Sequence, residues 1–407
     1  MAVSSVIEAK ENRSNLLSSR IIIFVVFFDL FIQFPIVAPY AKQLGASPTF
    51  VGIIMAAYSA TNLVGNIFSG LLLDRIGRRL PILIGALVTS GSLLGYALAN
   101  TANTLFIARI FHGLASSSLT PGSFALIGDA STKDSRANVM GVSAAFIAIA
   151  AIVGPMFAGI VTDKFSQQPV FVSAAIMMLV AVIVFWYLST ETIEKITPRN
   201  NKGSQTGREA KSLEIINRFD LITSSISVLA FTVGLGTLVT HLPVSLDALG
   251  LSASKSGTVF TIYAIVAMIA MISPLRKLSD TYGRLPFIIL GLLLISFGLF
   301  LLSLVSEFSG IILGMAVYGL GFGVLFPATT ALVADSAPLP KRGFAFGIFY
   351  GVYSGGVIIG SLLSGYLAEI FGPLTRSPFA VSSVIVCSVC ILGFAYYLKQ
   401  RTHSQIQ

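Results

Sequence analysis

The stretch GLLLDRIGRR, residues 70–79, lies between two apolar runs at 50–72 and 81–99. Each run has about the 20 predominantly apolar residues that a helix needs to cross the hydrocarbon core of a bilayer. Part of the stretch returns 206 residues further along the chain, where its aspartate, second glycine and next arginine recur as Asp280, Gly283 and Arg284. A charged turn between two spans, present twice, predicts a membrane protein built from two related halves.

The composition supports a chain that is solvated mostly by lipid. Of 407 residues, 55% are hydrophobic and only 11% are charged, with a mean hydropathy of +0.88. A soluble domain carries about 25% charged residues, so a chain of this length lacks the ions to cover a water-exposed surface. The net charge of +9 is spread over the connectors. We therefore expect no nucleic-acid partner, because no basic domain of adequate size is present.

Twelve apolar runs predict an all-α membrane protein with 12 transmembrane helices. The runs are 20–40, 50–72, 81–99, 104–128, 138–162, 169–189, 219–241, 257–275, 285–305, 308–333, 344–368 and 378–398. They predict an N-terminal six-helix bundle at 1–190, a linker at 191–218 with a short surface helix near 212–217, and a C-terminal six-helix bundle at 219–407.

The basic residues predict the orientation in the membrane. One set of connectors carries only Lys42, Lys164, Lys255 and Arg376. The other set, with the two ends, carries Lys10, Arg13, Arg75, Arg78, Arg79, Lys133, Arg136, Lys195, Arg199, Lys202, Arg208, Lys211, Arg218, Arg276, Lys277, Arg284, Lys341, Arg342, Lys399 and Arg401. Because Lys and Arg accumulate on the cytoplasmic side, we expect both termini and the central linker in the cytoplasm, in a cell membrane.

The two halves align without a gap at the same offset of 206 over roughly ninety residues. The recurring pairs include Gly113 and Gly319, Pro121 and Pro327, Asp129 and Asp335, Gly154 and Gly360, and Gly159 and Gly365. Two homologous bundles that rock around a shared cavity are the usual architecture of secondary transporters. The repeat therefore predicts transport by alternating access.

Residues 70–79 resemble, almost position for position, the signature G-x-L-x-D-R-x-G-R-R of the major facilitator superfamily. The resemblance implies that this turn latches the cytoplasmic side of the protein when the cavity is open outward. The alternative is that it marks topology alone. The residues expected in the gating motif are Gly70, Asp74, Arg75, Gly77, Arg78, Arg79, Asp129, Asp280, Gly283 and Arg284.

Three further motifs narrow the resemblance to the twelve-span drug:proton antiporters. Residues 109–113, with Arg109, His112 and Gly113, resemble the motif R-x-x-Q-G of proton-coupled members, with histidine in place of the amide. Gly154, Pro155 and Gly159 resemble the antiporter motif G-P-x-x-G-G, with Ala158 in place of one glycine. Pro35 and Pro39 resemble the proline pair of that family. The chain is also distantly similar to vesicular monoamine transporters, but it lacks the second-half membrane acids of that group.

Asp29 is the one acidic residue that the sequence places deep in a span, roughly 13 Å into a core about 30 Å thick. Arg109 is its deep basic counterpart. A charge at that depth destabilises the protein in the membrane unless it faces the bundle interior or a water-filled cavity. One hypothesis is that Asp29 binds a proton and a cationic substrate in turn, under the influence of Arg109. The other is that the two residues form a fixed structural ion pair.

His112 either relays protons, since imidazole titrates near physiological pH, or fills the bundle as a hydrogen-bonding residue. Proton coupling is therefore assigned to Asp29, Arg109 and His112. The same alternatives apply to His241. The residues expected to line a substrate cavity are Phe28, Asp29, Gln33, Tyr58, Asn62, Asn66, His241, Tyr318 and Tyr353.

These features predict a proton-coupled antiporter that exports amphiphilic, cationic drugs or small organic molecules. Alternatives are a proton-linked exporter of a sugar or another endogenous metabolite, and a lipid flippase. We expect no enzyme, because the sequence shows neither a catalytic cluster nor a nucleotide-binding G-x-x-x-x-G-K-[ST] motif. We also expect no cofactor and no metal, a monomer driven by the proton gradient, and Cys387 and Cys390 as apolar packing residues.

Overall fold

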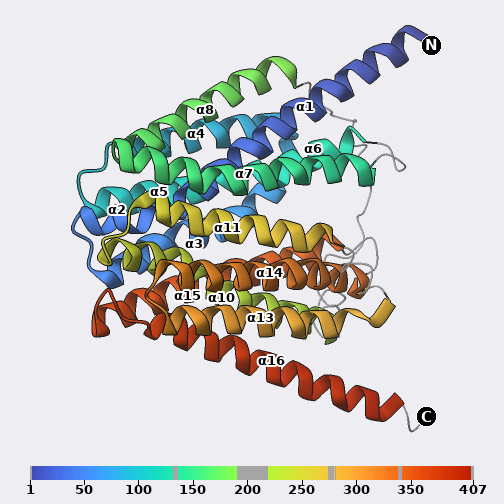
Figure 1. Ribbon diagram of the computed structural model, residues 1–407. Helices are drawn as coiled ribbons and strands as arrows, with labels where there is room; N and C mark the ends of the chain where they lie inside the picture. Colours follow the sequence, from blue (N-terminus) through green and yellow to red (C-terminus); the bar gives the residue numbers. More distant parts are fainter. Residues whose placement is uncertain are drawn as a thin grey trace. The chain divides into compact units, whose positions relative to one another are not determined.

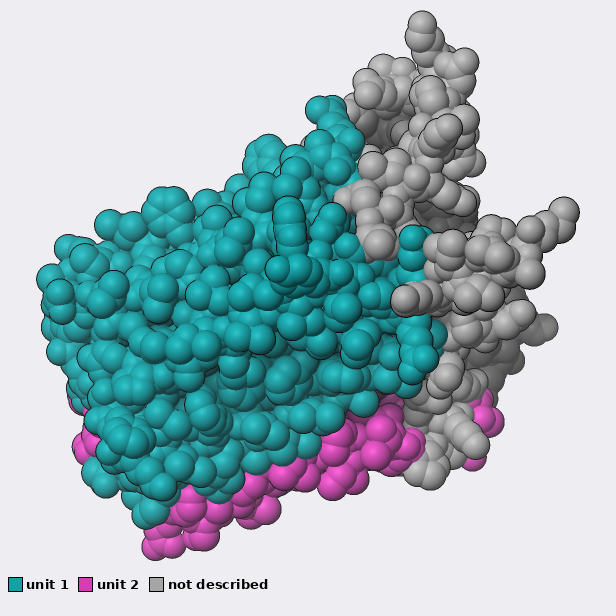
Figure 2. Space-filling view, turned by 90° about the horizontal axis from the view of Figure 1, so that it is seen from above, with its two compact units in different colours: residues 1–197, 250–261 teal, residues 198–249, 262–407 magenta. Residues whose placement is uncertain are grey.

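The computed structural model describes residues 2–131, 136–189, 219–273, 279, 281–337 and 342–404, and every regular element within them is a helix. The chain divides into two compact units (Figure 2). Unit 1 comprises Met1–Thr197 and Gly250–Thr261, and unit 2 comprises Pro198–Leu249 and Ile262–Gln407. The expected linker and its short helix lie outside the described residues, so the boundaries of the two predicted bundles stay a prediction.

The described residues of unit 1 form eight helices and the first part of a ninth. They are α1 (Ala2–Gln33), α2 (Val37–Gln43), α3 (Pro48–Ile76), α4 (Arg79–Ala97), α5 (Ala102–Ser116), α6 (Leu119–Asp129), α7 (Arg136–Lys164), α8 (Gln167–Leu188) and the start of α11 (Ala253–Ile272). Figure 1 shows α8 beside α4, and α8 packs on both α1 and α4. Their shared core includes Ile22, Ile82, Leu119, Met178 and Phe185.

Two of the expected spans in unit 1 are divided by a break. The run at 20–40 forms α1 and α2, with the break at residues 34–36. Pro35 lacks a backbone N–H, and Pro39 follows in the first turn of α2. The run at 104–128 forms α5 and α6, with the break at Ser117 and Ser118. Pro121 lies four residues after Ser117, where its ring would clash with that carbonyl in a continuous helix.

Unit 2 contains α10 (Phe219–Ala248), the rest of α11, α13 (Arg284–Leu304), α14 (Phe308–Ser336), α15 (Arg342–Phe371) and α16 (Ser377–Ser404). Helix α13 packs on α14 and α16, and α10 packs on α15. Glycines allow these helices to approach closely, since a Cβ on Gly291 would lie 2.7 Å from the Cβ of Leu325. Pro327, the counterpart of Pro121, lies within a continuous α14.

Eleven helices among the described residues are long and apolar enough to cross a membrane. The twelfth expected span corresponds to α5 and α6, each too short to cross alone. Large apolar side chains such as Phe68, Ile183 and Val384 are exposed, whereas many serines and threonines are buried. This distribution suits a protein whose outer surface meets lipid and whose polar groups pair inside. The chain is therefore a multi-pass membrane protein.

Candidate functional site

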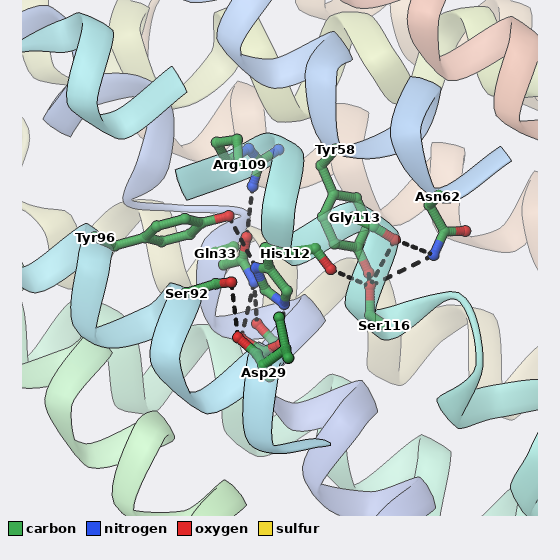
Figure 3. Close-up of polar contacts among 11 residues, drawn as sticks. Asp29, Gln33, Tyr58, Asn62, Ser92, Tyr96, Arg109, His112, Gly113 and Ser116 are labelled. Carbon is green, nitrogen blue, oxygen red and sulfur yellow. Dashed lines mark hydrogen bonds and ion pairs between the residues drawn. The ribbon is translucent and has the colours of Figure 1, made fainter. Parts of the chain in front are cut away.

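Four polar side chains meet in the interior of unit 1 (Figure 3). Asp29 and Gln33 lie four residues apart on α1, and Arg109 and His112 lie three residues apart on α5, so each pair shares one face of its helix. Their exposed fractions are 2%, 3%, 4% and 0%. We call these four residues the Asp29 cluster. The sequence predicted all four as site residues, and the structure brings them together.

The direct partner of Asp29 is His112. Nε2 of the imidazole lies 2.9 Å from Oδ2 of Asp29, and Nδ1 lies 2.8 Å from the hydroxyl of Tyr96 on α4. With a neutral imidazole, Nε2–H donates to the carboxylate and Nδ1 accepts from the phenol, which satisfies both ring nitrogens. The ring of Tyr58 packs edge-on against the imidazole, with centroids 5.0 Å apart. The imidazole is thus held in place by two hydrogen bonds and by an aromatic contact.

Among the described residues, Arg109 is linked to Asp29 through Gln33. The guanidinium donates from NH1 to Oε1 of Gln33 at 2.5 Å, and Nε2 of Gln33 donates to Oδ1 of Asp29 at 2.8 Å. The amide therefore lies between the cation and the carboxylate, as Figure 3 shows. This arrangement differs from the fixed Asp29–Arg109 ion pair that was one of the two hypotheses based on the sequence, and the other, that Asp29 binds a proton and a substrate in turn, stays a prediction.

The remaining partners of Arg109 are uncharged. Its Nε and NH2 groups donate to the backbone carbonyls of Ile54 and Met55 on α3, both at 3.2 Å. The guanidinium also lies over the rings of Tyr58 and Tyr96, at 5.2 Å and 6.0 Å from their centroids. Neutral oxygens and aromatic faces stabilise a buried cation without cancelling its charge.

A polar stripe on α3 extends from the cluster toward the surface. The hydroxyl of Ser116 donates to that of Tyr58 at 3.0 Å, and Nδ2 of Asn62 donates to the carbonyl of Gly113 at 3.2 Å. Asn66 in turn donates to Oδ1 of Asn62 at 2.9 Å. Tyr58 and Asn62 are half-buried, and Asn66 is exposed. The three α3 residues predicted for a substrate cavity thus form a continuous hydrogen-bonding stripe that begins beside the cluster.

Gly113 makes the approach of α5 to α3 possible. A Cβ at this position would overlap the side chain of Thr61 and the carbonyl of Tyr58. Any larger residue would push α5 away from α3 and would separate Arg109 from the carbonyls that it binds. The glycine of the R-x-x-Q-G-like motif therefore positions the arginine of the same motif.

The antiporter-like motif on α7 is a packing surface. A Cβ on Gly154 would lie 3.1 Å from the Cβ of Phe31 on α1, and a Cβ on Gly159 would lie 2.5 Å from the carbonyl oxygen of Ala253 at the start of α11. The carbonyl of Pro155 similarly leaves no room for a side chain at Gly257. Helix α7 thus meets α1 on one side and the first turns of α11 on the other, with backbone against backbone.

Asp163, at the end of α7, holds the start of α11. Its two carboxylate oxygens accept hydrogen bonds from the backbone N–H groups of Ala253 and Ser254, at 2.8 Å and 3.0 Å. These are two of the N–H groups that a helix leaves without an internal partner at its N-terminus. A carboxylate there also interacts favourably with the helix dipole.

The gating motif forms the same ion pair in both units. Nε of Arg78 lies 3.3 Å from Oδ2 of Asp129, and Nε of Arg284 lies 3.4 Å from Oδ2 of Asp335. The turns before the arginines also match, since Gly77 and Gly283 have φ values of 89° and 90°. A positive φ of this kind favours glycine. The repeat predicted from the sequence is therefore present in the folded units.

The other residues of the gating motif have separate positions. Arg79 donates to the carbonyl of Trp186 at 2.6 Å and lies over its ring, which ties the start of α4 to the end of α8. Arg75 is exposed, and Gly70 lies within α3. The side chain of Asp74 and all of Asp280 lie outside the described residues.

The remaining predicted cavity residues do not join the Asp29 cluster. Phe28 is buried and packs on Phe157, with ring centroids 5.5 Å apart. His241 is bonded to the carbonyl of Thr375 at 2.8 Å, within unit 2. Tyr318, whose hydroxyl donates to the carbonyl of Phe231, and Tyr353 belong to an aromatic group in unit 2. Their place in a substrate cavity stays a prediction.

Two residues of the site were missed from the sequence. Tyr96, which binds His112, comes from a different helix, and nothing in the α4 sequence marks it. Ser116 could have been predicted from its spacing, because it follows His112 by four residues and so lies on the same face of α5.

Comparison with known proteins places the chain among transporters. The family model of the Major Facilitator Superfamily matches residues 21–273 and, in a second match, residues 224–407. Multidrug resistance protein 1 of Bacillus subtilis (strain 168) is 28% identical over 388 residues, which cover 93% of this chain and 96% of the relative. Quinolone resistance protein NorA of Staphylococcus aureus (strain COL) is 27% identical over 356 residues, covering 86% and 90%.

The fold also matches solved transporters. The crystal structure of a D-xylose-proton symporter superimposes with a TM-score of 0.74 at 17% identity, covering 94% of this chain and 97% of that one. At this identity the likeness shows the fold alone.

Proposed function

Because the chain belongs to the Major Facilitator Superfamily, whose fold of twelve spans in two related halves it shares, we propose that it is a proton-coupled antiporter. Its proposed substrates are amphiphilic, cationic drugs or small organic molecules, which it exports by alternating access. The observation that carries the proposal is the buried contact between Asp29 and His112. A carboxylate bonded to an imidazole is a chemically suitable place to hold and release one proton.

The charges of the Asp29 cluster explain how a proton and a cation would exclude each other. With a neutral His112, the charges of Asp29 and Arg109 cancel, and the cluster is neutral overall. A bound proton adds one positive charge in a site that water screens poorly, and this charge repels a cationic substrate nearby. Release of the proton removes the repulsion. Direct contact between substrate and Asp29 is not required for this exchange.

The energy for export comes from the ion gradient in this proposal, without a cofactor. One elementary charge that crosses a potential of 100 mV is worth about 2.3 kcal/mol. The multidrug resistance protein and the quinolone resistance protein named above support a drug as cargo. The basic connectors support a cell membrane with both termini in the cytoplasm.

One observation favours the alternative, export of a sugar or another polar metabolite. The outer part of the α3 stripe consists of the amides of Asn62 and Asn66, which suit the hydroxyl groups of a neutral, polar compound. A buried carboxylate attracts a cation more strongly than it attracts a neutral compound, so we place the antiport of cations first.

Reconstituted protein separates these functions. With the lumen of proteoliposomes more acidic than the outside, the lipophilic cation tetraphenylphosphonium should be taken up, and a protonophore should abolish the uptake. The matched control for a change at Asp29 is Asp220→Asn, at an acidic residue in the first turn of α10, in unit 2. If glucose moves protons across the membrane and tetraphenylphosphonium does not, the alternative is correct and the cation antiporter is ruled out.

A further inference from the structure

Among the residues that the structure describes, the amide of Gln33 links the two buried charges of the Asp29 cluster. Its oxygen accepts from Arg109, and its nitrogen donates to both the carboxylate and the backbone carbonyl of Asp29, the latter at 3.0 Å. All polar atoms of this side chain are thus engaged in one direction, with the donor toward the anion and the acceptor toward the cation. The reverse orientation would place like partial charges against each other.

Arg109 continues this chain of hydrogen bonds into α3. Its other two nitrogens, Nε and NH2, donate to the carbonyls of Ile54 and Met55, one turn before Tyr58 and the polar stripe that contains Asn62 and Asn66. The order of contacts is therefore carboxylate, amide, guanidinium and α3 backbone. Successive hydrogen bonds of this kind polarise one another in a buried site. A change of charge at Asp29 alters each of them.

We propose that Gln33 is a positioning residue that transmits the protonation state of Asp29 through Arg109 to α3. This inference rests on the proposed proton site at Asp29 and assigns Gln33 a different role from the cavity contact expected from the sequence. When Asp29 is ionised, its charge strengthens the bond from Gln33, and the amide oxygen is held toward Arg109. When Asp29 gains a proton, that charge-assisted bond is lost, and Arg109 is held less firmly against α3.

A through-space effect of charge is the competing explanation, and the two make different predictions for the same variant. The titratable or charged groups near Asp29, among the described residues, are His112 and Arg109 on α5, Tyr58 on α3 and Tyr96 on α4. None of these changes in Gln33→Met, which has nearly the same size but forms no such hydrogen bonds. If charge alone couples proton and substrate, the variant behaves as the wild type does.

The test measures the dissociation constant of tetraphenylphosphonium for the purified full-length protein at about pH 5.5 and about pH 8, on either side of the histidine range. The ratio of the two constants reports the coupling between proton and cation. In Gln33→Met this ratio should be about tenfold smaller than in the wild type, within the usual range of coupling between sites. Affinity at the higher pH should stay within about threefold, because the ionised cluster keeps its other contacts.

A second variant and a control keep the result interpretable if Gln33→Met folds poorly. Gln33→Asn retains an amide but is one methylene too short to reach both partners. Its ratio of the two dissociation constants should therefore also be about tenfold smaller than that of the wild type. Gln167→Met, a buried glutamine at the start of α8, should keep the wild-type ratio. A wild-type ratio in both Gln33 variants overturns the inference.

Asp29→Asn distinguishes the failure of this inference from the failure of the proposed function. If Asp29→Asn abolishes the pH effect and the Gln33 variants keep it, Asp29 is the proton site and Gln33 does not transmit its state. If Asp29→Asn itself keeps the full pH effect, the proton site lies elsewhere, and both proposals fail.

Discussion

Nε2 of His112 lies 2.9 Å from Oδ2 of Asp29, and the two side chains are among the most deeply buried polar groups of unit 1. A buried carboxylate is tolerable only when a partner satisfies it, and here the partner is the imidazole of His112. In the proposed function, this pair has two states that differ by one proton. Arg109 is held separately, by the carbonyls of Ile54 and Met55 and by the amide of Gln33.

We expect His112→Gln to reduce proton-driven uptake by about tenfold or more, since proton transfer by a positioned side chain contributes at least that much. Glutamine can still donate a hydrogen bond to Asp29, so the fold should be kept, but an amide does not take up a proton. The measurement is tetraphenylphosphonium uptake at a series of imposed pH gradients. Wild-type rates across the series would mean that His112 has only a packing role.

Gly159→Ala should lower the stability of the protein by about 1–3 kcal/mol, because the added methyl group would lie 2.5 Å from the carbonyl oxygen of Ala253. The matched control is Gly141→Ala in the same helix, where a Cβ meets nothing within 4 Å. Alanine should be neutral or slightly stabilising there. Thermal unfolding in detergent compares the two, and equal melting temperatures would contradict the packing role of the antiporter-like motif.

Asp163→Ala should destabilise the start of α11 by roughly 0.5–2 kcal/mol, since it removes both acceptors from the N–H groups of Ala253 and Ser254. Asp163→Asn retains one acceptor and should lie between alanine and the wild type. Hydrogen exchange at residues 253–256 provides the readout. Unchanged protection in the alanine variant would show that the carboxylate is not needed to hold this helix end.

The ion pairs Arg78–Asp129 and Arg284–Asp335 should have similar and small coupling energies, about 0.2–1 kcal/mol in double-mutant cycles. Both pairs are partly exposed, and solvent screens them. Thermal unfolding of the two sets of single and double alanine variants gives these energies. A coupling energy well above this range in one unit alone would show that the two pairs are not equivalent.

The sequence predicted the spans and the internal repeat because both depend on local composition and spacing. Twelve apolar runs are visible without a structure, and the offset that relates Arg78 to Arg284 also relates Asp129 to Asp335. The breaks were less predictable. Pro121 and Pro327 are equivalent in the repeat, yet the helix is divided at the first and continuous at the second, so the surrounding packing decides the outcome.

For the site, the sequence identified the four buried polar residues of the Asp29 cluster but not how they are connected. Asp29, Arg109 and His112 stood out because charged or titratable groups are rare in spans. Their pairing depends on the rotation of α1 and α5 and on side chains from α3 and α4. The choice of His112 over Arg109 as the partner of Asp29, and the insertion of Gln33 between the two charges, are therefore properties of the fold.

The central claim, that Asp29 carries the coupled proton, is tested most directly in proteoliposomes that contain either wild-type protein or Asp29→Asn. Tetraphenylphosphonium accumulation is measured with an acidic lumen, and its one-for-one exchange is measured at equal pH. We predict that the variant exchanges the cation but no longer concentrates it, because asparagine does not bind a proton. Accumulation at the wild-type level by Asp29→Asn would contradict the account.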